Sequence, residues 1–189
     1  MSSYKTIINK DNILLEKKDN KFKLEASIKV KLPCNIINLT ENLEIFNLIK
    51  LLNNKIITKC KIITNSNNID SDIILCFNDN LQNVNSDSSD DLNNLIKIYY
   101  ITFSINIKKN NDNNIILLGK KNNITINKCN YKKIEIDNIL FNIELVNSEL
   151  NIKLKFINNT KVPIYAENAI GFMFFNFIKK LLVYFSKST

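Results

Sequence analysis

Carboxylates, cysteines and lysines are the side chains from which a chemistry could be built in this sequence, because the chain contains no His, Arg or Trp. Without imidazole there is no histidine general base, no histidine metal ligand and no Ser–His or Cys–His nucleophile pair. Glu135 and Asp137 lie two residues apart, on one face of a predicted strand, and superficially suggest a carboxylate pair. No partner base or metal motif accompanies them. We therefore expect a protein that is not an enzyme and that has no cofactor or metal.

The four cysteines are widely spaced. Cys34, Cys60, Cys76 and Cys129 form no C-x-x-C pair, so a zinc site would need an unusual spacing. We interpret them as small buried side chains in a reducing compartment. Three disulfide connectivities stay open if the chain is secreted, although the first ten residues are too polar for a signal peptide.

The net charge of +8 is unevenly distributed along the chain. Residues 1–61 and 97–189 are basic, whereas residues 62–96 contain six Asp and no Lys. Two basic segments favour a polyanionic partner, because neutralising phosphates releases counterions. Without Arg, every cationic contact with a phosphate must be a point-charge ammonium contact, so readout of base sequence is not expected.

Asn, Ile and Lys together make up about half of the sequence, and all three can be written with codons that contain only A and T. Such a bias is typical of an organelle genome, a parasite or endosymbiont, or a large A/T-rich virus. It also supplies the alternative reading of the charge, in which Lys is simply the common surface residue.

Alternation of apolar and polar residues predicts an α+β fold with mostly antiparallel strands. The β-rich runs are residues 22–30, 56–64, 73–77, 96–107, 124–126, 134–136, 139–146 and 150–156. The clearest helix is Glu41–Leu52, with Thr40 as its N-cap and apolar residues at every third position, and Asn53 ends it.

One segment recurs in the chain. Ile13–Asn20 and Ile116–Asn123 share a strand and a Lys-Lys turn, and an alternating strand follows each of them. Each copy predicts a β-hairpin with two ammonium groups at its tip. In a sequence dominated by three residue types, chance similarity is the alternative to a duplication.

Gly119 is one of two glycines in the chain. A glycine at the end of a strand usually provides a positive φ or a close approach of backbones. We expect a turn at this residue, with close approach to RNA as the alternative.

Several stretches in the second half of the chain share the pattern of one known family. They are Ile98–Phe103, Ile115–Lys121, Ile124–Ile126, Lys133–Ile136 and Lys161–Gly171. Together they resemble the second domain of the bacterial-type protein six of the large ribosomal subunit.

The resemblance implies two tandem copies of one small α/β unit, each with about one helix. Residues 1–77 would form the first unit and residues 95–189 the second, with an acidic loop or insert at residues 78–94. The resemblance also implies a helix near Ser148–Ile157, whereas the strict alternation over Leu150–Phe156 predicts a strand.

The function that the resemblance implies is that of a structural rRNA-binding protein in an organellar, mitochondrial large ribosomal subunit, with an organelle-encoded gene. Its partners would be rRNA and neighbouring ribosomal proteins, without a small-molecule substrate, a membrane span or a homo-oligomer. The residues expected to contact rRNA are Lys17, Lys18, Lys120, Lys121, Lys132, Lys133, Lys161, Tyr165, Gly171, Lys179 and Lys180. The alternative function is a structural β-protein of an A/T-rich virus particle, a capsid or tail component that self-assembles.

The C-terminal run Gly171–Phe185 contains five Phe. Asn176, Lys179 and Lys180 interrupt it, and it is too short and too interrupted to be predicted as a membrane-spanning helix. We expect it to dock on the core of the protein or on a neighbouring protein.

Overall fold

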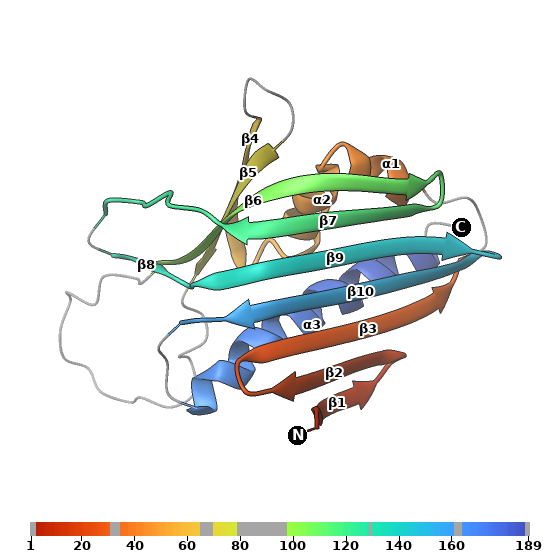
Figure 1. The fold of residues 1–189 in the computed structure, drawn as a ribbon, viewed down its shortest axis with the longest axis horizontal. Coiled ribbons are helices and arrows are strands. Elements are labelled where there is room, and N and C mark those ends of the chain that lie inside the picture. Colours follow the sequence, from red (N-terminus) through yellow and green to blue (C-terminus); the bar gives the residue numbers. More distant parts are fainter. Residues whose placement is uncertain are drawn as a thin grey trace.

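A mostly antiparallel sheet of ten strands and three helices form the part of the chain that the computed structural model describes (Figure 1). That part comprises residues 3–30, 35–64, 70–78, 98–128, 130–160 and 164–187, without the side chains of residues 164–167 and 187. The strands are β1 (Lys5–Lys10), β2 (Ile13–Lys18), β3 (Lys21–Lys29), β4 (Ile57–Thr64), β5 (Asp70–Asn78), β6 (Ile98–Asn111), β7 (Asn114–Lys121), β8 (Tyr131–Lys133), β9 (Ile136–Val146) and β10 (Glu149–Asn158). The helices are α1 (Ile36–Glu41), α2 (Glu44–Leu52) and α3 (Ile164–Lys187). The predicted α+β class with mostly antiparallel strands is confirmed.

The strands form one sheet in the order β1-β2-β3-β10-β9-β7-β6-β5-β4, and β8 pairs in parallel with the start of β6. The N-terminal strand β3 pairs along its length with β10, so that Phe22 lies opposite Phe156. The two tandem units are not confirmed, because strands from both halves share this sheet. Of the predicted acidic insert, Asn78 ends β5 and residues 79–94 lie outside the described residues.

Alternation of buried and exposed side chains along the strands turns one face of the sheet toward the helices. We call this the inner face, and the opposite one the outer face. On β10 every second residue from Leu150 to Asn158 is buried, and on β3 the same holds for Phe22, Leu24 and Ala26. Because successive side chains of a strand point to opposite faces, all of these lie on the helix side. The strand predicted over Leu150–Phe156 is therefore confirmed, and the helix that the resemblance implied there is wrong.

The predicted helix Glu41–Leu52 corresponds to α2, which begins at Glu44, and a separate helix, α1, ends at Glu41. Thr40 is not an N-cap but lies inside α1, where its hydroxyl donates to the carbonyl oxygen of Ile36. Between α1 and α2, Leu43 adopts the left-handed conformation (φ 60°) and is buried. A side chain with Cβ resists this conformation, so the break is maintained by the burial of Leu43. The predicted stop at Asn53 is confirmed.

The first predicted hairpin forms from β2 and β3, but the second does not form. Strand β7 already pairs with β6 on one side and with β9 on the other, which leaves no free edge for residues 124–126. These residues pack instead on the outer face of the sheet, where Ile124 and Ile126 contact a small cluster around Ile74, Cys76 and Tyr100.

No turn occurs at Gly119, which lies in β7 without a positive φ. A Cβ atom at this residue would stand 3.0 Å from the Cβ of Ile139 on β9. The glycine allows two strands of the protein itself to approach closely.

Cys60 and Cys76 are free thiols on β4 and β5, and Cys34 and Cys129 lie outside the described residues.

The C-terminal apolar run is helix α3, which lies along the inner face of the sheet (Figure 1). Of the two predicted alternatives, docking on the core is thus observed. The segment Asn168–Ser186 is long and apolar enough to cross a membrane by length and composition alone, with a mean hydropathy of 1.4. Half of it is buried inside the protein, and core helices of soluble proteins meet the same criterion.

Candidate functional site

The candidate site is a cavity of about 40 Å³ between the inner face of the sheet, α2 and α3. Twelve of the described side chains, from the two helices and five strands, line it, and all twelve are apolar. They are Phe46, Ile49, Leu75, Phe103, Ile105, Leu117, Ile139, Phe141, Leu154, Phe174, Phe177 and Ile178.

Strand periodicity explains why this space is apolar. Phe103 and Ile105 are two residues apart on β6, as are Ile139 and Phe141 on β9, so each pair points to the same face. Helices close the space from the other side. The α2 residue Phe46 contacts the Phe103 ring, with centroids 5.9 Å apart.

Helix α3 meets the sheet through aromatic rings. The ring of Phe174 lies 4.5 Å from that of Phe156 on β10 and 5.9 Å from that of Phe177, centroid to centroid. Phe177 in turn stacks on Phe77 of β5 at 6.1 Å. Such pairs add specific geometry to the burial of their large apolar surfaces. The aromatic contacts hold α3 over the cavity.

Two polar contacts also fasten α3. The ammonium of Lys179 lies 2.6 Å from a carboxylate oxygen of Asp11, in the turn between β1 and β2, and Lys180 donates to the carbonyl oxygen of Leu52 at 3.0 Å. The hydrogen bond from Lys179 lowers the pKa of Asp11. Both contacts are exposed to solvent, so they are weaker restraints on the helix than its buried face.

The described residues that line the cavity offer no acid–base or nucleophilic chemistry, because none of them has an ionisable or hydroxyl-bearing side chain. Among the described residues there is also no group of three or more His, Cys, Asp or Glu that could hold a metal ion. What the lining offers is apolar surface removed from water, which favours the binding of an apolar molecule.

Three of the predicted lysine pairs lie at one end of the sheet. Lys17 and Lys18 end β2, Lys120 and Lys121 end β7, and Lys132 and Lys133 lie on β8 (Figure 1). The first pair is separated from the second by β3, β10 and β9.

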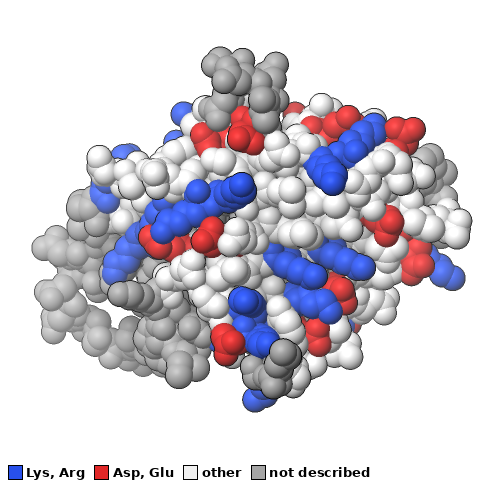
Figure 2. Space-filling model, viewed as in Figure 1, with Lys and Arg blue, Asp and Glu red and all other residues white. Residues whose placement is uncertain are grey.

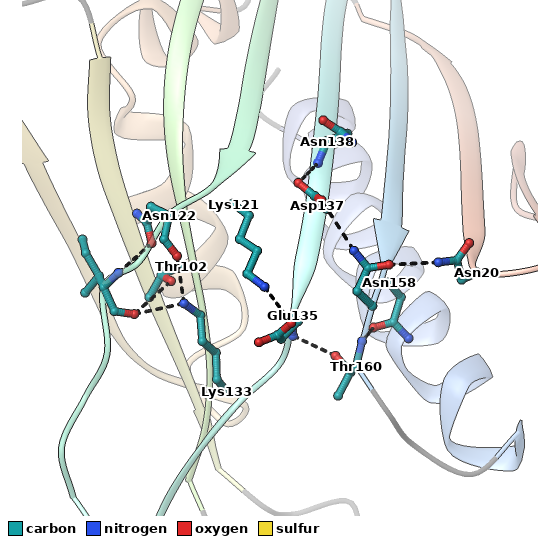
Figure 3. A network of polar contacts seen from close by, with 12 residues as sticks. Asn20, Thr102, Lys121, Asn122, Lys133, Glu135, Asp137, Asn138, Asn158 and Thr160 are labelled. Carbon is teal, nitrogen blue, oxygen red and sulfur yellow. Dashed lines mark hydrogen bonds and ion pairs between the residues drawn. The ribbon is translucent and has the colours of Figure 1, made fainter.

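Several of these ammonium groups are engaged within the protein. That of Lys17 lies 5.5 Å from the centre of the Phe22 ring. Lys121 forms a 2.8 Å ion pair with Glu135, and the hydrogen bond lowers the pKa of this carboxyl (Figure 3).

Lys133 has an internal role. Its ammonium donates to the carbonyl oxygens of Asn122 and Ile124, each at 3.0 Å (Figure 3). Thr102 on β6 donates to the same Ile124 oxygen at 3.4 Å. Burial lowers the pKa of Lys133. This lysine fastens the segment that follows β7 to the sheet.

The remaining predicted residues belong to α3 or lie outside the described part. Lys179 and Lys180 make the helix contacts given above, and Gly171 is buried against the sheet. Lys161 and the side chain of Tyr165 are not among the described residues.

The outer face of the sheet carries mixed charge. Lysines and acidic residues are interspersed over the face that Figure 2 shows. One such group joins Lys23 to Glu16 and to Glu25, at 3.2 Å each. A polyanion would meet both signs on this face, so the net charge of the chain overstates its attraction.

Comparison with known proteins shows which solved structures share this fold. No protein-family model matches the sequence, and no curated protein matches it. Among solved structures, the STAR-related lipid transfer protein of Xanthomonas axonopodis (fragment 25–204) matches with a TM-score of 0.66 at 8% identity, over 97% of this chain and 99% of that chain. This chain has the fold of the StAR-related lipid transfer structures, here called the START fold.

Two human structures have a similar fold. STARD10 matches with a TM-score of 0.67 at 10% identity, over 98% of this chain and 74% of that chain. The lipid transfer and protein localization domain of StarD13 (DLC2) matches with a TM-score of 0.63 at 10% identity, over 100% of this chain and 91% of that chain. At this identity the likeness concerns the START fold alone.

The START fold overturns the ribosomal assignment, because the ribosomal protein family has a different fold. The assignment depended on short Ile- and Lys-rich stretches, which a sequence of this composition produces without common descent. A structural role in a large ribosomal subunit, with rRNA and ribosomal proteins as partners, is therefore wrong, and the viral alternative has no support. The rRNA contacts predicted for the eleven residues lose their basis with it.

Three other expectations have different outcomes. The absence of a small-molecule partner conflicts with the START fold and with the apolar cavity. The mitochondrial location and the absence of enzyme activity are not tested by the fold and stay predictions.

Sequence reasoning missed the cavity. Its signal was present in two places: in the apolar alternation of β6, β7, β9 and β10, and in the Phe-rich C-terminal run. What was missing was that α2 and α3 would together cover the shared face of these strands.

Proposed function

We propose that this protein binds a lipid or a similar apolar molecule between its sheet and α3, and that it is not an enzyme. The observation that carries the proposal is the cavity, in which all twelve lining side chains are apolar. Each Å² of apolar ligand surface buried there contributes roughly 25 cal/mol to binding. The START fold supports the proposal, because the matching structures are named for lipid transfer.

The cavity must enlarge to admit such a ligand. Its volume of about 40 Å³ exceeds what one water molecule needs, roughly 10–15 Å³, but pockets for small organic ligands measure roughly 300–1,000 Å³. The sheet is held together by backbone hydrogen bonds, whereas the contacts described for α3 are side-chain packing and exposed polar contacts such as those of Lys179 and Lys180. Displacement of α3 from the sheet is therefore the less costly way to open the space.

A binding assay tests the proposal. The purified protein is mixed with phosphatidylcholine vesicles that contain a pyrene-labelled alkane, and the vesicles are then removed by centrifugation. We expect the protein to retain the label in a one-to-one complex, which native mass spectrometry would count. Folded protein that retains no apolar compound under these conditions would refute the proposal.

A second measurement addresses the absence of catalysis. Compounds extracted from the complex with organic solvent should be chemically identical to those supplied. A processed ligand, with a bond cleaved or a group transferred, would show that the protein is an enzyme.

A further inference from the structure

A groove of about 410 Å³ lies over β1, β2, β3 and β10, and we call it the outer groove. It is on the outer face of the sheet, the face that Figure 2 shows, and α3 covers the opposite face. Its volume is within the roughly 300–1,000 Å³ of pockets for small organic ligands. Nine described residues line it, and six of them are polar. The outer groove thus differs from the apolar cavity in place, size and chemistry.

Strand register sets the lining side chains in two rows. In the first row Asn9 lies opposite Leu14, and Leu14 lies opposite Glu25. Glu25 in turn lies opposite Lys153. Directly opposite residues share a face of the sheet, with Cβ atoms roughly 4.5–5.5 Å apart. The neighbour of Leu14 in the chain, Leu15, is buried on the inner face, so this row is on the outer face.

The second row lies two residues farther along the strands, roughly 7 Å from the first. In it Asn151 lies opposite Ser27. Asn12, in the turn between β1 and β2, accepts a hydrogen bond at its backbone oxygen from the N–H of Ser27 at 3.3 Å. Between the rows, Ala26 and Ile152 turn their side chains to the inner face and are buried there. Their backbones therefore form the floor of the outer groove.

Four of the six polar side chains have their full hydrogen-bonding capacity available. Within the described part of the chain, the amides of Asn9, Asn12 and Asn151 and the ammonium of Lys153 form no side-chain hydrogen bond or ion pair. Each amide offers two donor hydrogens and one acceptor oxygen, and the ammonium offers three donor hydrogens. A ligand in the outer groove can thus be met by donors and acceptors from three sides.

The other two polar side chains are partly engaged. Ser27 donates its hydroxyl hydrogen to Glu149, and its oxygen keeps the capacity to accept. Glu25 forms an ion pair with Lys23 through Oε2 at 3.2 Å, which leaves Oε1 as an acceptor. Both side chains therefore offer acceptors to a ligand.

The lining has no net charge, because Lys153 and Glu25 have opposite signs. The other four polar side chains are neutral amides and one hydroxyl, so an ion gains little from the lining as a whole. A neutral molecule with several hydroxyl groups can donate or accept at every one of these contacts. Leu14 and the methylene groups of Lys153 add apolar surface for its C–H groups.

We propose that the outer groove binds a neutral carbohydrate, a mono- or disaccharide, through the amides of Asn9, Asn12 and Asn151 and the charged groups of Glu25 and Lys153. The inference goes beyond the proposed function, because it concerns the other face of the sheet and another class of ligand. Asn9, Asn12 and Lys153 are exposed to solvent, and each hydrogen bond exchanged with water has a small net effect. We therefore expect a dissociation constant of about 1–10 mM.

A ¹H–¹⁵N NMR titration of the full chain tests the proposal. The probes are glucose, galactose, mannose, maltose and lactose, each added to about 100 mM, which is well above the expected dissociation constant. At least one of them should shift the backbone resonances of Glu25, Ser27 and Asn151 along a saturable curve. If none of the five does so, or if the shifts occur only at other residues, the proposal is wrong.

Charged derivatives of the sugar that binds test its neutrality. Its uronate and its amino sugar keep the ring and add a carboxylate or an ammonium. Because the lining has no net charge, each should bind within about threefold of the neutral sugar, and salt should not change the affinity of the neutral sugar. A derivative that binds more than about tenfold more tightly, with an affinity that falls in salt, would show that the outer groove takes an ion.

Substitutions on one strand locate the sugar. Lys153→Ala and Asn151→Ala should each weaken binding about fivefold, as the loss of one hydrogen bond allows. Lys155→Ala is the matched control, because Lys155 lies on the same face of β10, two residues from Lys153, and is not among the lining residues. Its affinity should equal that of the wild type. Equal affinity in all three variants would place the sugar elsewhere, and the NMR spectra would show that each variant is folded.

The outcomes separate this inference from the proposed function. The sheet lies between the outer groove and the cavity, so the sugar should not displace the pyrene-labelled alkane. If the protein binds the sugar and not the alkane, the proposed function fails and the inference stands. If it binds the alkane and none of the sugars, the reverse holds. A sugar that displaces the alkane in a one-to-one exchange would place both in the cavity and overturn the outer groove as the site.

Discussion

Gly171 of α3 lies so close to Phe22 of β3 that a Cβ atom at residue 171 would stand 2.8 Å from the Cε1 atom of the Phe22 ring. The same atom would lie 3.3 Å from Leu15 on β2. A Cβ atom does not approach a ring carbon to 2.8 Å, so the helix can pack at this depth because residue 171 has no side chain. The distance from α3 to the sheet, and with it the size of the cavity, depends on this contact.

Gly171→Val should therefore destabilise the protein. Overpacking a well-packed core costs roughly 1–3 kcal/mol, and Val regains only part of this through its better helix propensity. We expect the free energy of unfolding to fall by about 2 kcal/mol in urea denaturation followed by circular dichroism. Asn176→Val, on the exposed side of the same helix, is the control and should change the free energy little. Equal effects of the two substitutions would contradict the close contact.

The ion pair of Asp11 with Lys179 should make stability depend on acid pH. The pKa of Asp11 is lowered in the folded protein, so its ionised form stabilises the fold at pH values above the ordinary pKa of 3.8. This stabilisation is lost as pH falls through the lowered folded pKa. Asp11→Asn should thus be less stable than the wild type at pH 7, and the difference should shrink as the pH falls through the lowered folded pKa of Asp11.

Thermal unfolding of both proteins across this pH range, at low and at high salt, measures the effect. Asp112→Asn is a suitable control, because it removes an exposed ion pair of a different element, that of Asp112 with Lys109 at the β6–β7 turn. A difference between Asp11→Asn and the wild type that does not shrink as the pH falls below 3.8 would show that Asp11 acts through something other than its charge.

Much of the fold could be predicted from local patterns in the sequence. The alternation along β3 and β10 predicts two strands with one buried face, and both are observed. Asn53 ends α2 where the apolar period stops. These features are decided by neighbours in sequence, so periodicity predicts them.

Contacts between residues that are far apart in the sequence could not be predicted from periodicity. The pairing of Phe22 with Phe156 joins strands at opposite ends of the chain, and no local signal specifies it. The left-handed Leu43 breaks the predicted helix without a Gly or Pro to mark the position. The lysine pair of the second predicted hairpin misled for a similar reason, because pairing of β7 with β9 displaces the strand that would have completed the hairpin.

The candidate site contains features that could be predicted from local pattern and features that could not. The run 96–107, which contains Phe103 and Ile105, was predicted as a strand, and the Phe-rich tail was expected to dock on the core or on a neighbouring protein. That Phe174 and Phe177 of this tail face the same space as Phe46 depends on how α2 and α3 pack on the sheet. The cavity is a tertiary feature, and a composition dominated by Lys and Asn drew attention to the surface instead.

The thiol of Cys60 should react slowly. Burial raises its pKa to about 11 from the ordinary value of 9.0, so at pH 8 its thiolate fraction is about a hundredfold lower than that of a free cysteine. Alkylation by iodoacetamide at pH 8, followed by mass spectrometry of the peptide that contains Cys60, should be slower by a similar factor than in urea-unfolded protein. Labelling at the same rate in the folded and unfolded states would mean that the Cys60 thiol is not shielded from solvent in the folded protein.

Filling the cavity should block ligand binding without unfolding the protein. Leu117 of β7 is fully buried and lines the cavity, whereas the next residue, Leu118, points to the opposite face and is 39% exposed. In Leu117→Phe the larger ring would occupy much of the 40 Å³ available, and the strain of overpacking is partly offset because it fills a void. We expect the free energy of unfolding to change by less than about 1.5 kcal/mol. Affinity for the pyrene-labelled alkane should fall at least about tenfold, which corresponds to the loss of about 55 Å² of apolar contact.

Leu118→Phe is the matched control, because it adds the same ring one residue along the strand on the outer face. It should bind the alkane with the affinity of the wild type. If Leu117→Phe and Leu118→Phe both bind as the wild type does, the ligand does not enter between α3 and the sheet. If both lose affinity equally, the effect comes from β7 as a whole and the cavity is not the site. A loss in Leu117→Phe alone places the ligand on the inner face, since the two side chains share a strand, a neighbourhood in sequence and a chemical change, and differ in the face they occupy.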